Sequence, residues 1–238
     1  MIQISRLLLW FNIVNYDIDA CLRDIAPRLH GRLLDVGCGQ KQSLFFPYVS
    51  EYIGLEYEDA LHVNRTKSAA HADVYGDALD LPFRKNSFDS VCAISLLEHV
   101  SEPARAIDEA YRVLKKGGTF ALVAPFMYRL HLAPYDYFRF TQYGMAYMLE
   151  SSGFVVEKLV CVGGMWKMIA GRLAGYLYSD IAGLGYGPGD RDGTATRWYL
   201  LPIILPAIAL IVILGRLLDR IHYVKKDAVL IYAVCRKK

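Results

Sequence analysis

The sequence predicts an α/β fold in which a parallel β-sheet carries helices on both faces. Short apolar runs of strand length alternate with segments of helical period along most of the chain, as expected for such a sheet. One of these runs, residues 32–36 (RLLDV), leads into Gly37, Cys38 and Gly39. A buried strand that ends in a glycine-rich turn before a helix exposes free N–H groups where ligands of these sheets bind. The strand and its turn therefore predict a nucleotide-type pocket.

The composition fits one large globular domain. The chain has 238 residues, of which 54% are hydrophobic and 21% charged, so a full core is available and a disordered chain is excluded. The net charge of +3 is too small to indicate a nucleic-acid partner. The five cysteines form no Cys-x-x-Cys pair, so neither a disulfide framework nor a zinc site is expected, and a reducing cytoplasm is the simpler location.

The first thirty residues are expected to form two helices that pack on the domain. Apolar side chains recur at helical spacing over 4–15, and no cleavage site of a signal peptide follows them. Asp17 is a suitable N-cap for a second helix that ends near Pro27. The apolar side of that helix would consist of Ile18, Cys21, Leu22 and Ile25.

Glycines and prolines mark where the expected helices and strands of the core begin and end. Pro103 is tolerated at a helix start, and Gly117 and Gly118 are suited to follow a helix. Pro125 stops a strand, and Gly153 lies just past a helix. The expected strands after the opening one are 51–56, 72–76, 87–95, 119–124, 154–162 and 228–235. The expected helices are 41–48, 104–116 and 141–151.

A dinucleotide is one candidate ligand of the glycine-rich turn. Glu56 lies about twenty residues after the turn, where an acid would bind ribose hydroxyls. Tyr111 and Lys115 also form the Tyr-x-x-x-Lys spacing of some hydride-transfer enzymes, although they fall in an ordinary amphipathic helix. The third glycine of the dinucleotide fingerprint is missing, because position 42 is Gln. An NAD(P)-dependent oxidoreductase is therefore an alternative function.

Five motifs follow one another along the core. They are LLDVGCG at 33–39, GLE at 54–56, GDALDLPFRKNSFDSV at 76–91, LLEHV at 96–100 and RVLKKGGTFALVAP at 112–125. As an ordered set they resemble the class I S-adenosylmethionine-dependent methyltransferases, in particular the type 11 group. The resemblance implies a Rossmann-like doubly wound sheet of seven strands in the order 3-2-1-4-5-7-6, with strand 7 antiparallel. It also implies S-adenosyl-L-methionine as cofactor.

By position, the resemblance assigns the first strand and its turn to the methionine part of the cofactor. Gly37 and Gly39, with Cys38 between them, would face that part. Asp35 would lie beneath the turn and hold its geometry or reach the amino group. A turn-capping acid is the structural alternative for Asp35.

The later strand ends would bind the rest of the cofactor. Glu56 would take the ribose hydroxyls, and Asp77 and Ala78 would meet the adenine edge. Ser95 would border the methyl donor. The structural alternatives are a solvated strand end for Glu56, a turn residue for Asp77 and a helix cap for Ser95.

Methyl transfer to a hydroxyl or amine requires a proton acceptor, which points to histidine. His99 follows the fourth strand next to Glu98, and His131 follows the fifth, so both are candidate bases. A structural role beside the cofactor is the alternative for His99. No metal site is expected, because the sequence offers no second carboxylate cluster near this pair.

An aromatic segment, residues 131–143, is expected over the mouth of the pocket. Tyr135 and Tyr137 would wall the methyl site, and Arg139 would hold an anionic group of the acceptor. The alternative is a packed loop in which Arg139 pairs with Asp136.

The last feature is an apolar insertion between the sixth and seventh strands. Residues 199–214 contain no charged side chain. This apolar stretch is barely long enough for a membrane-spanning helix. Both strands belong to one sheet, so a single pass is excluded. A membrane-surface hairpin, a buried or dimer-forming helix pair through 196–222, and a two-pass hairpin remain.

The chain is thus expected to be one methyltransferase domain over 1–238. N-terminal helices occupy 1–30, the core occupies 31–162 and 227–238, and the insertion occupies 163–226. The expected function is methyl transfer to a small-molecule or lipid-linked acceptor, by default at oxygen, in the cytoplasm or at the inner face of the membrane. A non-catalytic module that binds a membrane or partner is a further alternative.

Overall fold

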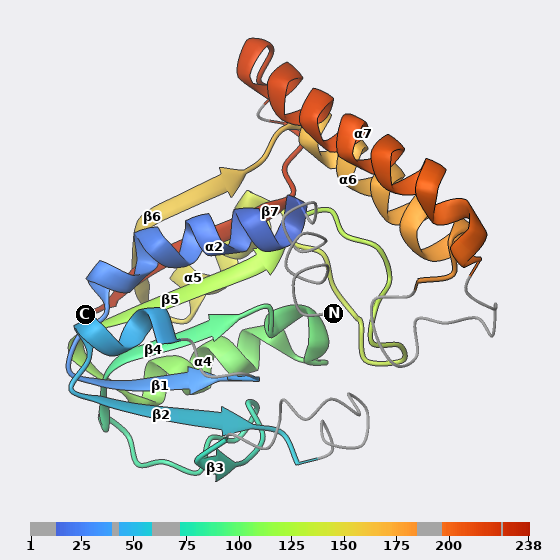
Figure 1. The fold of residues 1–238 in the computed structure, drawn as a ribbon. Helices are drawn as coiled ribbons and strands as arrows, with labels where there is room; N and C mark the ends of the chain where they lie inside the picture. The colour runs from blue at the N-terminus through green and yellow to red at the C-terminus, as the bar shows by residue number, and fades with distance from the viewer. Residues whose placement is uncertain (1–12, 40–42, 59–71, 185–196, 225) are drawn as a thin grey trace.

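A seven-stranded sheet forms the centre of the computed structural model, which describes residues 13–39, 43–58, 72–184, 197–224 and 226–238 (Figure 1). The strand order is β3-β2-β1-β4-β5-β7-β6, and β7 runs antiparallel to both neighbours while the other pairs are parallel. The predicted fold class, strand order and direction of the last strand are confirmed. The strands are β1 (Arg32–Val36), β2 (Glu51–Glu56), β3 (Val74–Tyr75), β4 (Phe88–Ile94), β5 (Leu114–Pro125), β6 (Phe154–Val162) and β7 (Leu230–Lys237).

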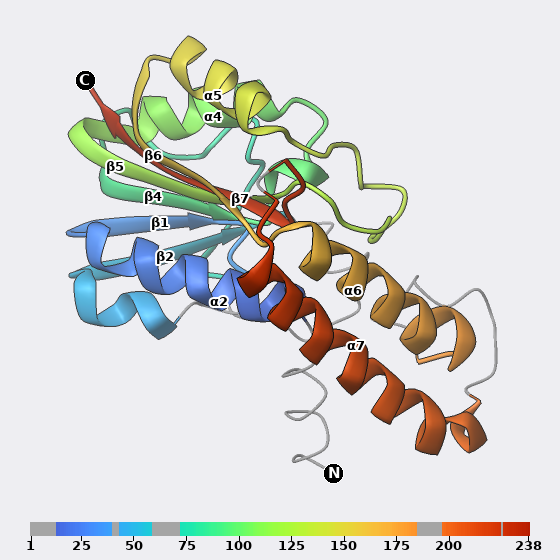
Figure 2. The same ribbon diagram turned by 90° about the horizontal axis from the view of Figure 1, so that it is seen from above.

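Helices cover both faces of the sheet (Figure 2). One face carries α2 (Ile13–Ile25) and the short 3₁₀ helix η1 (Ala26–Arg28), whose buried side chains pack on Ala121 and Val123 of β5. The other carries α4 (Pro103–Val113) and α5 (Gln142–Ser151). Both faces of β5 are therefore buried, which explains its continuous apolar run.

Parallel pairing brings the carboxyl ends of β1, β2 and β4 to one edge. Val36 of β1 lies beside Leu55 of β2 and Ala93 of β4. The residues that follow these positions, Gly37, Glu56 and Ile94, therefore begin the same rim.

Several expected boundaries were wrong. The segment expected as a helix at 41–48 is a 3₁₀ helix, η2 (Ser43–Tyr48), with Pro47 inside it. Asp17 does not begin a second helix: it lies within α2, is buried, and pairs with Lys167 Nζ at 3.0 Å. The helix expected over 104–116 ends at Val113, because Leu114 already pairs with Phe88 in the sheet. The expected helix over 4–15 lies mostly outside the described residues.

The insertion forms a helical hairpin that projects from the sheet (Figures 1 and 2). It consists of α6 (Met165–Tyr176), the π-helical turn η5 (Leu177–Ile181), the 3₁₀ turn η6 (Trp198–Leu200) and α7 (Leu201–Ile221). Gly215 permits close contact of the two helices, since a Cβ there would lie 2.4 Å from Ala170 Cβ. The hairpin has its own small apolar core, separate from those of the sheet.

The outer surface of this hairpin is strongly apolar. Among the described residues, the helical segment Trp198–Ile221 is long and apolar enough to cross a membrane, by length and composition alone, and only 22% of its most apolar window is buried. Because β6 and β7 pair with each other, the chain enters and leaves the hairpin at the same side of the sheet. The strand pairing on which the exclusion of a single membrane pass depends is therefore present, and the exclusion itself stays a prediction.

Candidate active site

A cavity of about 510 Å³ opens at the carboxyl ends of the parallel strands, a size typical of small-molecule sites. Its walls come from the turns after β1 to β4 and from the loop between β5 and α5. The residues expected there from sequence that do line it are Gly37, Gly39, Glu56, Asp77, Ala78, Ser95, His99, His131, Tyr135 and Tyr137.

The glycine-rich turn after β1 is held by backbone contacts. Gly37 has φ +73°, a conformation that favours glycine, and a Cβ at this position would lie 2.8 Å from Leu96 Cδ1, so a larger residue would displace the Leu96 side chain. The Gly37 amide donates to Leu55 O at 2.8 Å. The Gly39 amide donates to Glu56 Oε2 at 2.9 Å, and the turn is thereby fixed to the end of β2.

Glu56 therefore has a second role that the sequence does not reveal. Its Oε1 accepts from the Tyr57 amide at 3.1 Å, so both carboxylate oxygens are oriented by backbone N–H groups. A carboxylate oxygen has lone pairs beyond one hydrogen bond, and those of Glu56 remain available at the cavity wall.

Asp35 and Cys38 are not among the residues that line the cavity. Asp35 is 1% exposed beneath the turn, where the Tyr52 hydroxyl donates to it. Burial raises the pKa of Asp35 to about 6. Cys38 is buried as well. The geometry supports the first expectation for Asp35, that it holds the turn, and assigns Cys38 to packing.

Asp77 and Ser95 form turns at the rim. Asp77 Oδ1 accepts from the Leu79 amide at 2.9 Å, so its expected role as a turn residue is present together with its place in the cavity wall. Ser95 has φ +52° and donates its amide to Val123 O at 2.8 Å. The chain therefore bends sharply after β4 and enters the 3₁₀ turn η4 (Leu97–His99).

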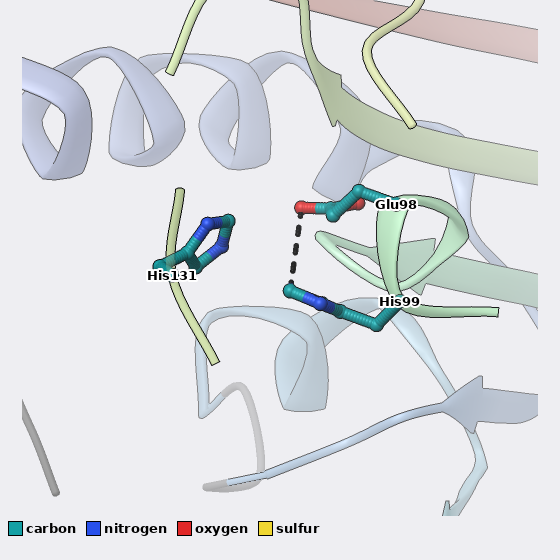
Figure 3. Close-up of side chains that lie close together, drawn as sticks. All are labelled: Glu98, His99 and His131. Atoms are coloured by element: carbon teal, nitrogen blue, oxygen red, sulfur yellow. Dashed lines mark ion pairs between the residues drawn. The ribbon is translucent and has the colours of Figure 1, made fainter. Parts of the chain in front are cut away.

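Three side chains gather where η4 meets the loop after β5 (Figure 3). Glu98, His99 and His131 each offer one atom within 4.8 Å of the others. Glu98 is 1% exposed, its Oε1 lies 3.9 Å from His99 Nε2, and its Oε2 has no hydrogen-bond partner among the described residues. Burial raises the pKa of Glu98 to about 8 and lowers that of His99.

Contacts with main-chain oxygens orient both histidines. His99 Nδ1 lies 2.7 Å from Tyr135 O, and His131 Nδ1 lies 3.1 Å from Arg129 O. A carbonyl oxygen only accepts, so in the neutral imidazole of each residue Nδ1 carries the proton and Nε2 keeps a lone pair.

Asp136 and Arg139 brace the loop after β5. Arg139 donates from Nη1 and Nη2 to Asp136 Oδ1 and Oδ2 at 2.6 and 2.8 Å. Its other N–H groups donate to the main-chain oxygens of Tyr128, Arg129 and Phe138. Burial alone would raise the pKa of Asp136, but the hydrogen bonds from Arg139 and from the His131 amide lower it to about 2.

This arrangement corrects the expectation that Arg139 binds an anionic acceptor. All five N–H groups of Arg139 already donate within the loop, and Arg139 is not among the residues that line the cavity. The alternative stated from sequence, a packed loop with an Arg139–Asp136 pair, describes the geometry.

The loop also contacts its surroundings on two sides. The Tyr137 amide donates to Glu98 O at 2.8 Å, which fixes the loop to η4. On the other side the Arg129 guanidinium contacts the Ser179 hydroxyl and lies 3.7 Å from Asp180 Oδ2, in the π-helical turn of the hairpin. The cavity wall is thus joined to the insertion.

Sequence reasoning missed some of the wall. Leu96, Leu132 and Tyr57 also line the cavity. Leu96 belongs to the LLEHV motif, which was a usable signal. Leu132 has φ +53° next to the cis Ala133–Pro134 peptide, a conformation that no local pattern indicates.

Comparison with known proteins identifies the domain. Residues 34–122 match the family described as Methyltransferase domain. Demethylmenaquinone methyltransferase of Clavibacter sepedonicus is 34% identical over 109 residues, which cover 43% of this chain and 44% of that protein. The uncharacterized methyltransferase YcgJ of Bacillus subtilis is 31% identical over 128 residues, which cover 50% of this chain and 48% of that protein. The matched region is thus about half the length of these curated relatives.

Solved structures share the fold over almost the whole chain. The crystal structure of YcgJ has a TM-score of 0.53 and 17% identity, and covers 94% of this chain and 99% of its own. A Haemonchus contortus phosphoethanolamine N-methyltransferase 2 in complex with S-adenosyl-L-methionine has a TM-score of 0.51 and 17% identity, and covers 93% of this chain and 52% of its own. Residues 34–122 are thus similar to a methyltransferase domain, and the strand order is the one expected of the class I S-adenosylmethionine-dependent methyltransferases.

Proposed function

We propose that this protein transfers the methyl group of S-adenosyl-L-methionine to an oxygen atom of a small-molecule or lipid-linked acceptor. One observation carries the proposal: the cavity has polar groups suited to the donor on one wall and paired histidines on the other. Glu56 and Asp77 would bind the ribose and adenine of the donor, and the turn at Gly37 leaves room for its methionine part.

The reaction is a displacement in line with the S–C bond of the sulfonium. The protein contributes chiefly by holding donor and acceptor in that line without water, which supplies up to about 7–11 kcal/mol. Tyr135 and Tyr137 would wall the acceptor. The Nε2 lone pair of His99 or His131 would take the hydroxyl proton, a contribution of about 10²–10⁴-fold.

Calorimetry with S-adenosylhomocysteine and with NAD separates the proposal from its main alternative. We expect S-adenosylhomocysteine to bind and NAD not to bind. Binding of NAD without S-adenosylhomocysteine would identify an oxidoreductase. A screen with a ¹³C-labelled methyl donor then identifies the acceptor atom, because O-, N- and C-methyl carbons differ in chemical shift. An N- or C-methyl product would overturn the oxygen assignment alone.

Substitutions in the same cavity test the alternative that the protein is a non-catalytic module. Gly37→Arg would fill the turn, so we expect it to abolish methyl transfer. If a biological function measured in cells survives both Gly37→Arg and Glu56→Ala, the proposed enzyme is wrong.

We further propose that the acceptor is lipid-linked and that the protein works in the cytoplasm, at the inner face of the membrane. The hairpin supports this, because α7 exposes large apolar side chains such as Ile203, Leu210 and Ile221. Trp198 and Tyr199 precede α7, and Arg220 lies in its last turn, a distribution suited to a headgroup region. The ion pair between Arg129 and Asp180 would keep the loop between β5 and α5, which carries Tyr135 and Tyr137, close to that apolar surface.

Liposome flotation tests the membrane contact. We expect the full chain to float with vesicles that contain anionic lipid, and the triple variant Ile203→Gln/Leu210→Gln/Ile221→Gln to stay in solution. Tyr143→Gln/Tyr147→Gln is the matched control, since these side chains on α5 are as exposed but lie outside the hairpin. A wild-type chain that stays in solution as a monomer contradicts the proposal, and a dimer that dissociates in the triple variant indicates a second copy instead.

A further inference from the structure

Glu98, His99 and His131 form a set of side chains whose polar atoms lack full partners. The Glu98 carboxyl is nine-tenths buried or more, and its Oε2 has no hydrogen-bond partner in the described part of the chain. Its Oε1 is 3.9 Å from His99 Nε2, which is too long for a hydrogen bond. Leaving a buried carboxyl oxygen unpaired is costly, so a missing partner is indicated.

The two histidines present the kind of atom that this partner would need. Each Nδ1 is held by a main-chain oxygen, and His131 Nδ1 also lies 3.2 Å from Asp136 Oδ2. Hydrogen bonding of this kind fixes ligand histidines in metalloproteins, because it orients the ring and leaves Nε2 unprotonated. Figure 3 shows Glu98 and both rings converging on one space.

We propose that Glu98, His99 and His131 bind one divalent transition-metal ion of the zinc class at the cavity wall. Two imidazoles and one carboxylate are a ligand set suited to such ions, and three protein ligands leave a coordination position open. The three ligand atoms lie within 4.8 Å of one another. Bonds of about 2.0–2.2 Å require them to approach by roughly 1 Å, and the loop after β5 would carry His131 through this shift on ion binding.

The sequence did not predict this site. We expected no metal because the sequence offers no clear second carboxylate cluster near Glu98 and His99. The third ligand comes from the loop after β5, which the Arg139–Asp136 pair folds back onto η4.

The consequence for chemistry rests on the proposed methyl transfer, whereas cation binding itself does not. The open coordination position faces a cavity that His99 and His131 line. A hydroxyl of the acceptor bound there would release its proton to solvent water more readily, because the cation stabilises the resulting alkoxide, and the alkoxide oxygen would then take the methyl group as the S–C bond breaks. The histidines would then serve as ligands, and the cation would replace them in activating the acceptor.

Metal titration of the untagged full chain tests the proposal. After dialysis against a chelator, we expect calorimetry with zinc chloride to give one ion per chain, and Co²⁺ to give the visible absorption of a bound ion. Mg²⁺ should not compete, because it prefers an all-oxygen set. Glu98→Gln and His131→Ala should each weaken zinc binding by about tenfold or more, since changes in the shell around a metal already cost 10–100-fold.

His222→Ala is the matched control, because His222 is an exposed histidine at the end of α7, outside the cluster. It should bind zinc as the wild type does. Circular dichroism and thermal unfolding check that each variant folds. If Glu98→Gln does not fold, the zinc affinity of His131→Ala tests the site. The proposal is overturned if the wild type takes up no stoichiometric zinc, or if both cluster variants bind it with unchanged affinity.

The titration also separates this inference from the proposed function. S-adenosylhomocysteine binding is measured on the same zinc-free protein. Zinc uptake without S-adenosylhomocysteine binding would retain the cation site and remove the methyltransferase proposal. S-adenosylhomocysteine binding and methyl transfer without zinc uptake would do the reverse.

Discussion

The Glu56 carboxylate accepts a hydrogen bond from the Gly39 amide at 2.9 Å, which joins the end of β2 to the turn after β1. One side chain thus shapes the glycine-rich turn and faces the cavity. We expect Glu56→Ala to weaken S-adenosylhomocysteine binding by about 10–100-fold, because hydrogen bonds to a charged group contribute roughly 1.5–3 kcal/mol. Calorimetry measures this change.

Glu51→Ala is the control for this variant. Glu51 lies at the opposite end of β2 and pairs with Arg32 at 2.9 Å on the surface. The affinity of the Glu51→Ala variant for S-adenosylhomocysteine should equal that of the wild type. Equal loss in both variants would mean that disruption of β2, rather than the site, causes the effect.

Gly37→Ala should reduce both stability and cofactor affinity. A left-handed φ costs a residue with a side chain about 1–2 kcal/mol, and the new Cβ would displace Leu96, which lines the cavity. Gly117→Ala separates the two effects, because Gly117 has φ +75° but nothing within 4 Å of its Cβ position. Urea unfolding should show a similar loss in both variants, with S-adenosylhomocysteine binding weakened only in Gly37→Ala. Unchanged binding in Gly37→Ala would contradict the assigned place of the turn.

Asp35 should make stability depend on pH in the acidic range. Burial raises its pKa from the ordinary 3.8 to about 6, so the folded state binds a proton more tightly than the unfolded state. The contribution of Asp35 to the free energy of unfolding is therefore fully present below about pH 4 and is lost as pH rises to about 6. The change amounts to about 3 kcal/mol.

Asp35→Asn should lack this pH dependence, so the difference between variant and wild type in urea unfolding should vary from pH 4 to pH 7. Asp89→Asn gives a control of opposite sign. Although burial alone would raise the pKa of Asp89, hydrogen bonds from Lys115 and from the Arg32 amide lower it. Its stabilising contribution is present at neutral pH and is lost as pH falls. A constant difference for Asp35→Asn across the range would contradict the buried, ionisable state of Asp35.

Arg139→Lys should loosen the loop between β5 and α5. Lysine cannot reproduce the bidentate pair with Asp136 or the three hydrogen bonds to main-chain oxygens. Hydrogen exchange of amides in residues 128–139 should accelerate by about tenfold or more, while S-adenosylhomocysteine binding stays unchanged.

Arg105→Lys is the control for that substitution, because Arg105 makes only an exposed ion pair with Glu102 at 3.7 Å. Its exchange pattern should match that of the wild type. If Arg139→Lys also leaves exchange unchanged, the loop is held by other contacts.

The donor side of the site was largely predictable from local sequence. A strand fixes where its last residue lies, and parallel strands bring these ends to one edge, so Gly37, Glu56 and Asp77 were located by pattern alone. Local patterns were less reliable at boundaries. The sheet extends β5 back to Leu114 against the helical preference of its flanking residues, and α2 runs through Asp17, whose buried carboxyl pairs with Lys167 of α6.

The sequence by itself determined the fold class, the strand order through its ordered motifs, and the edge of the sheet that holds the cavity. Only the tertiary structure decided what lies opposite the donor wall. It brought His131 to Glu98 and His99, turned Arg139 inward to Asp136, and joined Arg129 to Ser179 and Asp180 of the hairpin. These contacts join residues that are distant in the chain or lie in an irregular loop. Periodicity reports only which side of an element faces the core, so no sequence pattern specifies such contacts.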